Sequence, residues 1–165
     1  MKFLSSRVLI LVVVSSSFLV SVTSCKKSNS GGSNSVAASV GGTAWASNVT
    51  VIGIYSTQVG LGVFDIGAFQ VKGKDSTTFS LTFTTPFAVN KSFSSDTTNL
   101  DISYQDINGL PFDASAGLGH SLMTITSYDS TGHRIAGTFS GVLYDPNNDS
   151  LVVTGGTFNT SLLAQ

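Results

Sequence analysis

Residues 79–84, Phe-Ser-Leu-Thr-Phe-Thr, hold the most regular pattern in this chain of 165 residues. Apolar and hydroxyl side chains alternate, so Phe79, Leu81 and Phe83 are expected on one face and the residues between them on the other. This period of two is typical of a β-strand with one buried face. A turn at Lys72–Asp75 precedes the strand and Pro86 ends it. The stretch therefore predicts a strand that contributes three large side chains to a core.

Comparable stretches, rich in Val, Ile, Thr and Phe, lie on both sides of this strand. We expect further strands over residues 49–55, 61–71, 100–104, 123–128, 135–144, 151–154 and 158–162, and a short first strand around Trp45. Residues 91–98 are expected to be a polar connection and residues 106–120 a long irregular segment. No helical pattern of about 12 residues occurs. The predicted fold is all-β: an antiparallel β-sandwich of about eight strands, or alternatively a small antiparallel β-barrel.

The composition agrees with this fold class and limits the possible partners. Hydrophobic residues make up 41% of the sequence and charged residues only 10%, so Ser, Thr, Asn and Gly must form the surface. All nine acidic residues are Asp. From Val36 onward four basic residues stand against these nine aspartates, which gives a net charge of −5. Because nucleic-acid-binding proteins carry basic patches, we do not expect nucleic acid as a partner.

The N-terminal segment has the layout of a secretory signal peptide. Lys2 and Arg7 are followed by an unbroken apolar run over residues 8–14 and then by small residues. The segment ends in Val22-Thr23-Ser24-Cys25, which resembles the lipobox of bacterial lipoproteins, and the chain has no second cysteine. The resemblance implies cleavage before Cys25, acylation of this cysteine, including by palmitate, and anchoring in a membrane.

The chain is accordingly divided into three parts. We expect a cleaved lipoprotein signal peptide over residues 1–24, the lipidated Cys25 with a flexible Gly- and Ser-rich tether over residues 25–35, and a single all-β domain over residues 36–165. Lys26 and Lys27 follow the cysteine, whereas surface-export signals of this bacterial type resemble acidic residues at that place. The expected location is therefore the cell envelope, in the outer membrane and facing the periplasm.

The C-terminal part carries a second resemblance. Residues 135–141, Ile-Ala-Gly-Thr-Phe-Ser-Gly, and residues 152–159, Val-Val-Thr-Gly-Gly-Thr-Phe-Asn, flank a turn rich in Asp and Asn. Together with residues 42–45, Gly-Thr-Ala-Trp, this pattern resembles small lipoprotein domains of the Bacteroidota type, a group whose function is uncharacterised. The resemblance implies an all-β lipoprotein and brings no catalytic residues with it.

Two histidines are the first candidates for chemistry. His120, in a Gly-rich segment with Asp113 nearby, is the better candidate for a ligand-binding loop, whereas His133 beside Gly132 is interpreted as an exposed turn residue. Neither histidine has a second His at metal-ligand spacing, and no nucleophile motif occurs. We therefore predict no catalytic residue, no metal site and no cofactor.

A partial calcium-loop pattern opens at Asp145, because Asn147 and Asp149 follow at the spacing of oxygen ligands. The sixth position is Ser150 instead of Gly, and the twelfth is Gly156 instead of a bidentate Glu. The preferred interpretation is a turn held by Asx hydrogen bonds.

Four Asp-Ser or Asp-Thr pairs at predicted turns resemble the sequon at which Bacteroidota O-glycosylate exported proteins. The acceptor hydroxyls belong to Ser76, Thr97, Ser130 and Ser150. Asp followed by Ser or Thr is also a frequent turn dipeptide, so both interpretations remain open.

Three functional hypotheses follow. The first is a lipid-anchored envelope lipoprotein with a non-catalytic binding or structural role, whose partner is an envelope protein, a glycan or a small apolar ligand. The second is a small barrel that holds a lipid or another apolar ligand, which requires an internal cavity of roughly 300 Å³ or more lined by Phe residues. The third is a hydrolase, which requires His120 within hydrogen-bond reach of an Asp and a hydroxyl in one cleft. We expect the first, with Trp45 packed in the core and no enzymatic activity.

Overall fold

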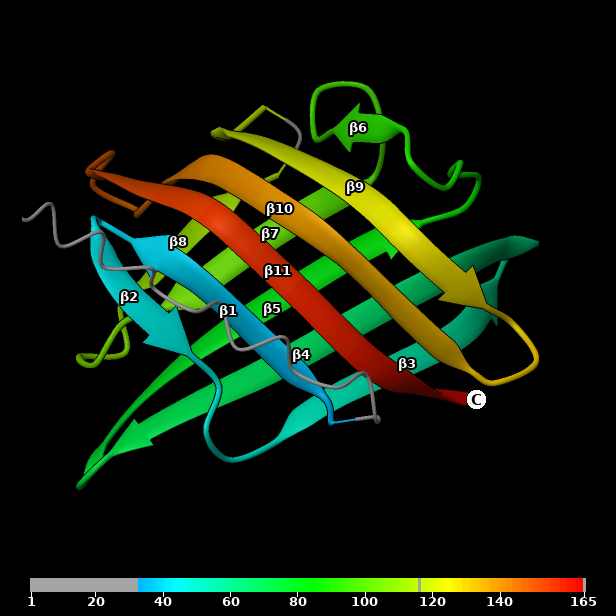
Figure 1. Ribbon diagram of the computed structural model, residues 1–165. Coiled ribbons are helices and arrows are strands. Elements are labelled where there is room, and N and C mark those ends of the chain that lie inside the picture. The colour runs from blue at the N-terminus through cyan, green and yellow to red at the C-terminus, as the bar shows by residue number, and fades with distance from the viewer. Residues whose placement is uncertain (1–32, 116, 165) are drawn as a thin grey trace, which may run out of the picture.

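The computed structural model describes residues 33–115 and 117–164, so the predicted leader, Cys25 and most of the tether lie outside the described residues. Every regular element in these ranges is a β-strand, which confirms the all-β class (Figure 1). The strands are β1 (Ser35–Val40), β2 (Thr43–Ala46), β3 (Val51–Gln58), β4 (Leu61–Lys72), β5 (Asp75–Thr84), β6 (Ser92–Ser94), β7 (Leu100–Gln105), β8 (Pro111–Ala114), β9 (His120–Asp129), β10 (Arg134–Tyr144) and β11 (Ser150–Ala164).

Hydrogen bonds join the eleven strands into one mixed sheet in the order β2-β1-β11-β3-β4-β5-β7-β8-β10-β9-β6, and β10 also pairs with β11. The pairing thus runs in a ring from β11 through β3 to β10 and back. Two short pairings complete the ring. Tyr144 pairs with Asp113 between β10 and β8, and residues 162–164 of β11 run parallel to residues 53–55 of β3. The other strand pairings are antiparallel, as the short turns predict.

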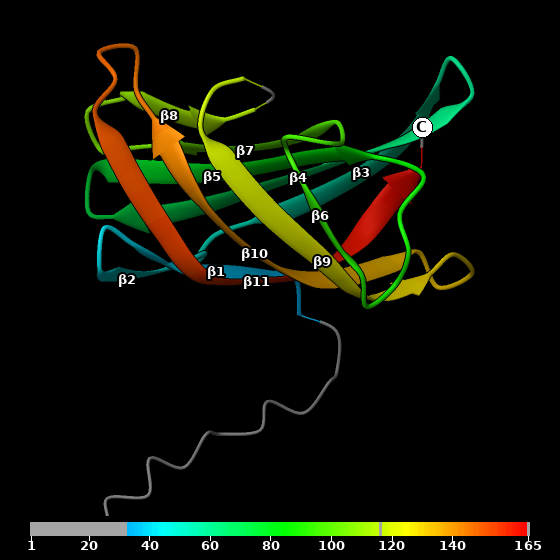
Figure 2. The ribbon, with the colours of Figure 1, turned by 90° about the horizontal axis from the view of Figure 1, so that it is seen from above.

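The ring is folded into two layers that face each other. One layer contains β2, β1, β11, β10 and β9, and the other contains β3, β4, β5, β7 and β8 (Figure 1). Their strands cross at a steep angle in Figure 1, and Figure 2 shows one layer lying over the other. The predicted face-to-face packing is therefore present, within one continuous network of strand pairs.

The core lies between the layers, and residues 79–84 supply its centre as predicted. Phe79, Leu81 and Phe83 are at most 1% exposed. Phe64 of β4 stacks on Phe83, with ring centroids 5.1 Å apart and planes 3° apart. From the opposite layer, Phe139 approaches Phe79 at 5.5 Å. Aromatic side chains thus fill the space between the layers and hold them together by apolar burial and ring contacts.

Glycines on β10 and β11 make space for the rings of Phe139 and Phe158, which lie in the same layer. A Cβ added at Gly156 would lie 2.7 Å from the ring of Phe139 and 2.5 Å from its carbonyl oxygen. A Cβ at Gly137 would lie 2.6 Å from the ring of Phe158. The ring of Phe139 therefore lies directly over the backbone of Gly156, and the ring of Phe158 lies over that of Gly137.

Three strands were not expected from the sequence. β1 precedes the predicted first strand, β6 lies in the predicted polar connection, and β8 lies in the segment expected to be irregular. All three are short, and each depends on a partner from elsewhere in the chain: β1 on β11, β6 on β9 and β8 on β7. The sheet also extends slightly toward the tether, since Asn34 donates to the carbonyl oxygen of Val51 at 3.2 Å.

Candidate functional site

A cleft opens at the end of the molecule where β2 lies beside the β4–β5 hairpin and β7. Its volume is about 290 Å³. Its lining combines apolar, hydroxyl, amide and charged side chains from five segments of the chain: Val40, Thr43, Ala44, Trp45, Gln70, Lys72, Asp75, Thr77, Tyr104 and Ile107. These segments are distant in sequence. β2 is held at this place by its pairing with β1.

Trp45 fixes the floor of the cleft. Its side chain is 4% exposed and meets Phe79 edge to face at 4.8 Å, which confirms the predicted core position. Its indole Nε1–H donates to the Thr77 hydroxyl at 2.7 Å. The Thr77 side chain is in turn hydrogen-bonded to Tyr104. Because an indole only donates and a hydroxyl carries one hydrogen, a chain from Trp45 through Thr77 to Tyr104 leaves the Tyr104 O–H free to donate.

The environment of Tyr104 keeps this phenol protonated. Burial raises the pKa of Tyr104, the hydrogen bond from Thr77 lowers it, and the negative charge of Asp106 raises it again, with a net upward shift. At neutral pH the side chain is therefore a neutral hydroxyl that both donates and accepts.

The mouth of the cleft carries one positive and one negative side chain. Lys72 and Asp75 are directly opposite each other across the Gly73-Lys74 turn. Opposite side chains of an antiparallel pair have Cβ atoms about 4.5–5.5 Å apart. Neither group nevertheless forms an ion pair with any residue in the described ranges. Both side chains line the same hollow and remain available to a bound molecule.

Side-chain hydrogen bonds to backbone hold the wall of the cleft in place. The Gln70 amide nitrogen donates to the Ala46 carbonyl oxygen at 2.8 Å, which joins β4 to the end of β2. Asn48 donates to the Val71 carbonyl oxygen and accepts from the Val71 amide, both at 2.8 Å. Gln70 also lines the cleft, and its side-chain carbonyl oxygen remains as an acceptor.

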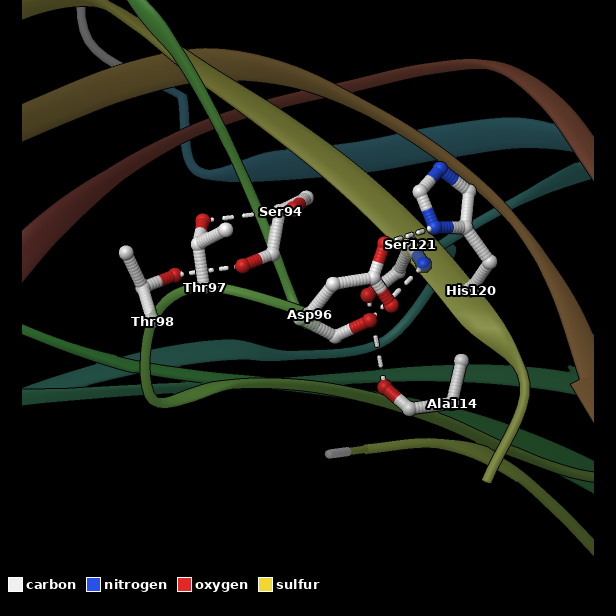
Figure 3. A network of polar contacts seen from close by, with 8 residues as sticks. Ser94, Asp96, Thr97, Thr98, Ala114, His120 and Ser121 are labelled. Atoms are coloured by element: carbon white, nitrogen blue, oxygen red, sulfur yellow. Dashed lines mark hydrogen bonds and ion pairs between the residues drawn. The ribbon is translucent and has the colours of Figure 1, made fainter. Parts of the chain in front are cut away.

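A second polar cluster contains His120, whose hydrogen-bond partner is an aspartate 24 positions earlier in the chain. The Nδ1 atom of His120 lies 2.6 Å from Oδ2 of Asp96, and the two side chains are 52% and 53% exposed (Figure 3). Asp113 is instead placed on β8, opposite Ser103 and Tyr144. The two residues of the predicted ligand loop are therefore strand residues, with Asp113 on β8 and His120 at the start of β9.

Two buried serines beneath this pair dock the loop that carries Asp96 onto β9. The Ser121 amide donates to the Ser95 hydroxyl at 3.0 Å, and the Ser95 amide donates to the Ser121 carbonyl oxygen at the same distance. The Ser121 hydroxyl donates to the Ala114 carbonyl oxygen at 3.3 Å (Figure 3). These hydrogen bonds fix Ser95 next to Ser121, so the adjacent Asp96 lies within hydrogen-bond distance of His120.

The chemical scope of this pair is limited by its surroundings. His120 and Ser140 line one shallow hollow of about 230 Å³ with Leu122, Val142 and Val152. Among the described residues, the hydrogen bond to Asp96 is the one that the His120 ring makes. The Asp required by the hydrolase hypothesis is therefore present, whereas a hydroxyl bonded to the other ring nitrogen is not part of the described structure.

The remaining candidates lie at the surface or in turns. Asp145 accepts hydrogen bonds from the amides of Asn147 and Asp149 at 2.9 and 2.7 Å, so the predicted Asx turn is confirmed. In residues 33–115 and 117–164, no group of three or more metal-ligating side chains is arranged to hold an ion. His133 is exposed in the turn between β9 and β10. The four predicted acceptor hydroxyls are all exposed: Ser76, Thr97, Ser130 and Ser150.

The sequence did not indicate the cleft, although its signals are visible afterwards. Lys72 and Asp75 flank a two-residue turn and were assigned only to that turn. The sequence pattern predicts a strand position for Tyr104 and a place next to the turn for Thr77. Only the pairing of β2 beside this hairpin turns these residues into one site.

No family model matches the chain, and no curated protein or solved structure is similar enough to carry an argument. Across the part of the chain that is described, no helix has the length and apolar character needed to span a membrane. The function of the protein must therefore be inferred from its own residues.

Proposed function

We propose that this protein is a lipid-anchored lipoprotein of the cell envelope whose all-β domain binds a small ligand without transforming it. The anchor is the lipobox-like sequence ending at Cys25, and we place the domain on the periplasmic side of the outer membrane. The observation that carries the binding role is the cleft beside Trp45, in which Lys72 and Asp75 face the same hollow without pairing.

Unpaired groups in a preformed hollow are typical of a binding site. Small-molecule sites are concave and combine apolar walls with a few polar groups that fix the orientation of the ligand. The cleft has this combination, and its volume of about 290 Å³ suits a small molecule. The hydrogen bonds of Gln70 and Asn48 keep the wall in place, so the ligand does not have to organise it.

The rival hypothesis of an apolar ligand inside the domain has less support. Phe64, Phe79 and Phe83 are fully buried between the layers and contact other rings. A lipid chain in this space would have to displace these rings. The Trp45 cleft, with its charged mouth, would leave polar groups unpaired against a hydrocarbon chain, which is costly.

The anchoring part is tested with Cys25→Ala, with Ser28→Ala as the matched control. We expect wild type and Ser28→Ala to incorporate labelled palmitate and to sediment with membranes. Cys25→Ala should lose the label and appear in the soluble periplasmic fraction, because two or more acyl chains are needed for stable anchoring. Membrane association of Cys25→Ala equal to wild type would contradict the proposal.

The binding part is tested through Trp45, the single tryptophan of the chain. A protein-free extract of the envelope of the producing cell should shift the NMR signal of the indole N–H. Ala44→Phe, which places a large side chain in the cleft, should abolish the shift. Ala46→Phe, exposed on the same strand but outside the cleft lining, should retain it. An extract that leaves the signal of the wild-type protein unchanged would refute the binding role.

A further inference from the structure

The geometry points to an uncharged saccharide, of about the size of one or two sugar rings, as the ligand of the Trp45 cleft. We infer this from the number and type of polar groups that converge there, and the inference rests on the proposed binding function. Six polar side chains line the cleft: Thr43, Gln70, Lys72, Asp75, Thr77 and Tyr104.

Donors and acceptors are mixed within this set. Lys72 offers an ammonium donor and Asp75 a carboxylate acceptor, at positions directly opposite across the hairpin. Tyr104 keeps a free O–H donor, while Gln70 keeps its carbonyl oxygen because its amide nitrogen is used by Ala46. A hydroxyl group both donates and accepts, so neighbouring hydroxyls of one sugar ring can accept from Lys72 and donate to Asp75.

The charges of the cleft do not select a charged ligand. Lys72 and Asp75 cancel, and the cleft is open to solvent, which screens attraction to an ion. A hydrogen bond to either charged group is nevertheless stronger than one between neutral groups. Saccharide hydroxyls gain these charge-assisted hydrogen bonds and lose little hydration energy compared with an ion.

The rest of the lining suits the carbon skeleton of a sugar. Val40, the edge of Trp45 and the half-exposed Ile107 form the apolar part of the wall. These surfaces can cover the C–H face of a ring while the hydroxyls point to the polar side. The volume of about 290 Å³ lies at the lower end of small-molecule sites and is too small for a long oligosaccharide.

Other small molecules match the six polar side chains of the cleft less well. An amino acid has an ammonium and a carboxylate for Lys72 and Asp75, but no further hydroxyls for Tyr104 and Gln70. An acyl chain has one polar end and would leave most of the six groups unpaired. The number of convergent polar groups therefore favours a polyhydroxylated ligand.

The experiment titrates the purified full-length protein in detergent with three sets of probes and follows the Trp45 indole N–H signal and fluorescence. The first set contains glucose, galactose, mannose, N-acetylglucosamine and their disaccharides, the second contains glycine and leucine, and the third contains laurate. We expect at least one neutral saccharide to give a saturable shift, while glycine, leucine and laurate give none.

Three variants locate the binding. Lys72→Ala and Asp75→Asn should each weaken binding of the active saccharide by about tenfold, the loss expected for one hydrogen bond to a charged group. Lys74→Ala, in the same turn but outside the cleft, should bind as wild type. All three positions are at the surface of a hairpin, and unchanged unfolding curves will show that the variants are folded.

Two results would overturn the saccharide assignment while leaving the binding function intact. In the first, the envelope extract shifts the indole signal but no saccharide does. In the second, a saccharide binds but Lys72→Ala and Asp75→Asn bind it as well as wild type. Absence of a shift with both the extract and all probes would instead refute the binding function itself.

Discussion

The space between the two layers and the cleft beside Trp45 are both lined by aromatic side chains, yet one is filled and the other is open. Between the layers, Phe64 and Phe83 belong to the buried hydrophobic cluster and pack ring against ring. In the cleft, the Trp45 N–H donates to the Thr77 hydroxyl, and that hydroxyl donates to the oxygen of Tyr104. Covering a polar group with apolar side chains costs free energy unless the group keeps a hydrogen-bond partner. The apolar core therefore stops at these polar residues.

This comparison shows what keeps the cleft open. Apolar residues are not lacking there, because Val40, Trp45 and Ile107 all contribute to its wall. The hollow persists because hydrogen-bonding groups and two charges occupy the positions at which a further phenylalanine would close the layer. Variants on the two sides of this boundary should therefore respond differently.

The largest effect is expected in the filled region. Phe139→Ala should lower the free energy of unfolding by about 3–5 kcal/mol, because it leaves a cavity next to Phe79 and Phe158. Phe69→Ala is the matched control, since Phe69 is 38% exposed on the outer face and should cost much less. Urea unfolding of both variants checks this, and equal losses would contradict the assigned inner face of β10.

A smaller effect is expected where backbone and ring approach most closely. Gly156→Ala should destabilise the domain by about 1–3 kcal/mol, because the new methyl group meets the ring and carbonyl oxygen of Phe139. Gly67→Ala offers the contrast, since the nearest atom to its added Cβ is 4.0 Å away. Thermal unfolding should show Gly67→Ala to be neutral or slightly stabilised. A neutral Gly156→Ala would show that the ring of Phe139 can move away from β11 at low cost.

The sequence also predicts some parts of the structure better than others. The centre of the core was predictable because the alternation in residues 79–84 shows which side chains point inward. The short strands β1 and β6 were not predictable, because they pair with β11 and β9, which are far away in the chain. β8 pairs with the preceding strand β7, but its four residues are too few to show an alternating pattern. A local pattern of three to six residues carries no information about distant partners.

The sequence does not predict the candidate sites either, because each site combines residues that are distant in the chain. His120 was singled out, but Asp96 lies 24 positions earlier and reaches it only through the Ser95–Ser121 hydrogen bonds. The cleft depends on β2 lying beside a hairpin whose Thr77 is 32 positions from Trp45. The types of residue were visible, whereas their convergence is a property of the tertiary structure.

On the open side, Thr77→Val should cost about 1–2 kcal/mol. The substitution preserves shape but removes the acceptor of the buried Trp45 N–H, and an unsatisfied buried donor is destabilising. The proton resonance of the indole N–H should move upfield as the hydrogen bond is lost. Thr78→Val, one position along and on the other face of β5, should leave both the stability and the resonance unchanged. If Thr77→Val behaves in the same way, the hydrogen-bond chain does not hold the cleft.

The smallest effect concerns two aspartates on β7 and the turn after it, whose environments shift their pKa values in opposite directions. Burial, and then the negative charge of Asp113, raise the pKa of Asp101, and one of its carboxylate oxygens is buried without a hydrogen-bond partner. Burial also acts to raise the pKa of Asp106, but hydrogen bonds from Leu110, Asn108 and Gly109 outweigh it, so the net shift is downward.

Opposite shifts predict opposite effects of the same substitution. A raised folded-state pKa means that ionised Asp101 destabilises the domain, a cost absent below the unfolded-state pKa and complete once the pH exceeds the folded-state pKa. Asp101→Asn should therefore stabilise the domain at pH 7, by less than about 1 kcal/mol because solvent screens this half-exposed group, and the gain should vanish in acid. For Asp106 the contribution is favourable above the unfolded-state pKa and is lost as the pH falls through the lowered folded-state pKa. Asp106→Asn should destabilise the domain at pH 7, and this loss should also disappear in acid. Unfolding curves of both variants from pH 3 to neutral pH check the pair, and the same sign for both would contradict the environments described for these carboxylates.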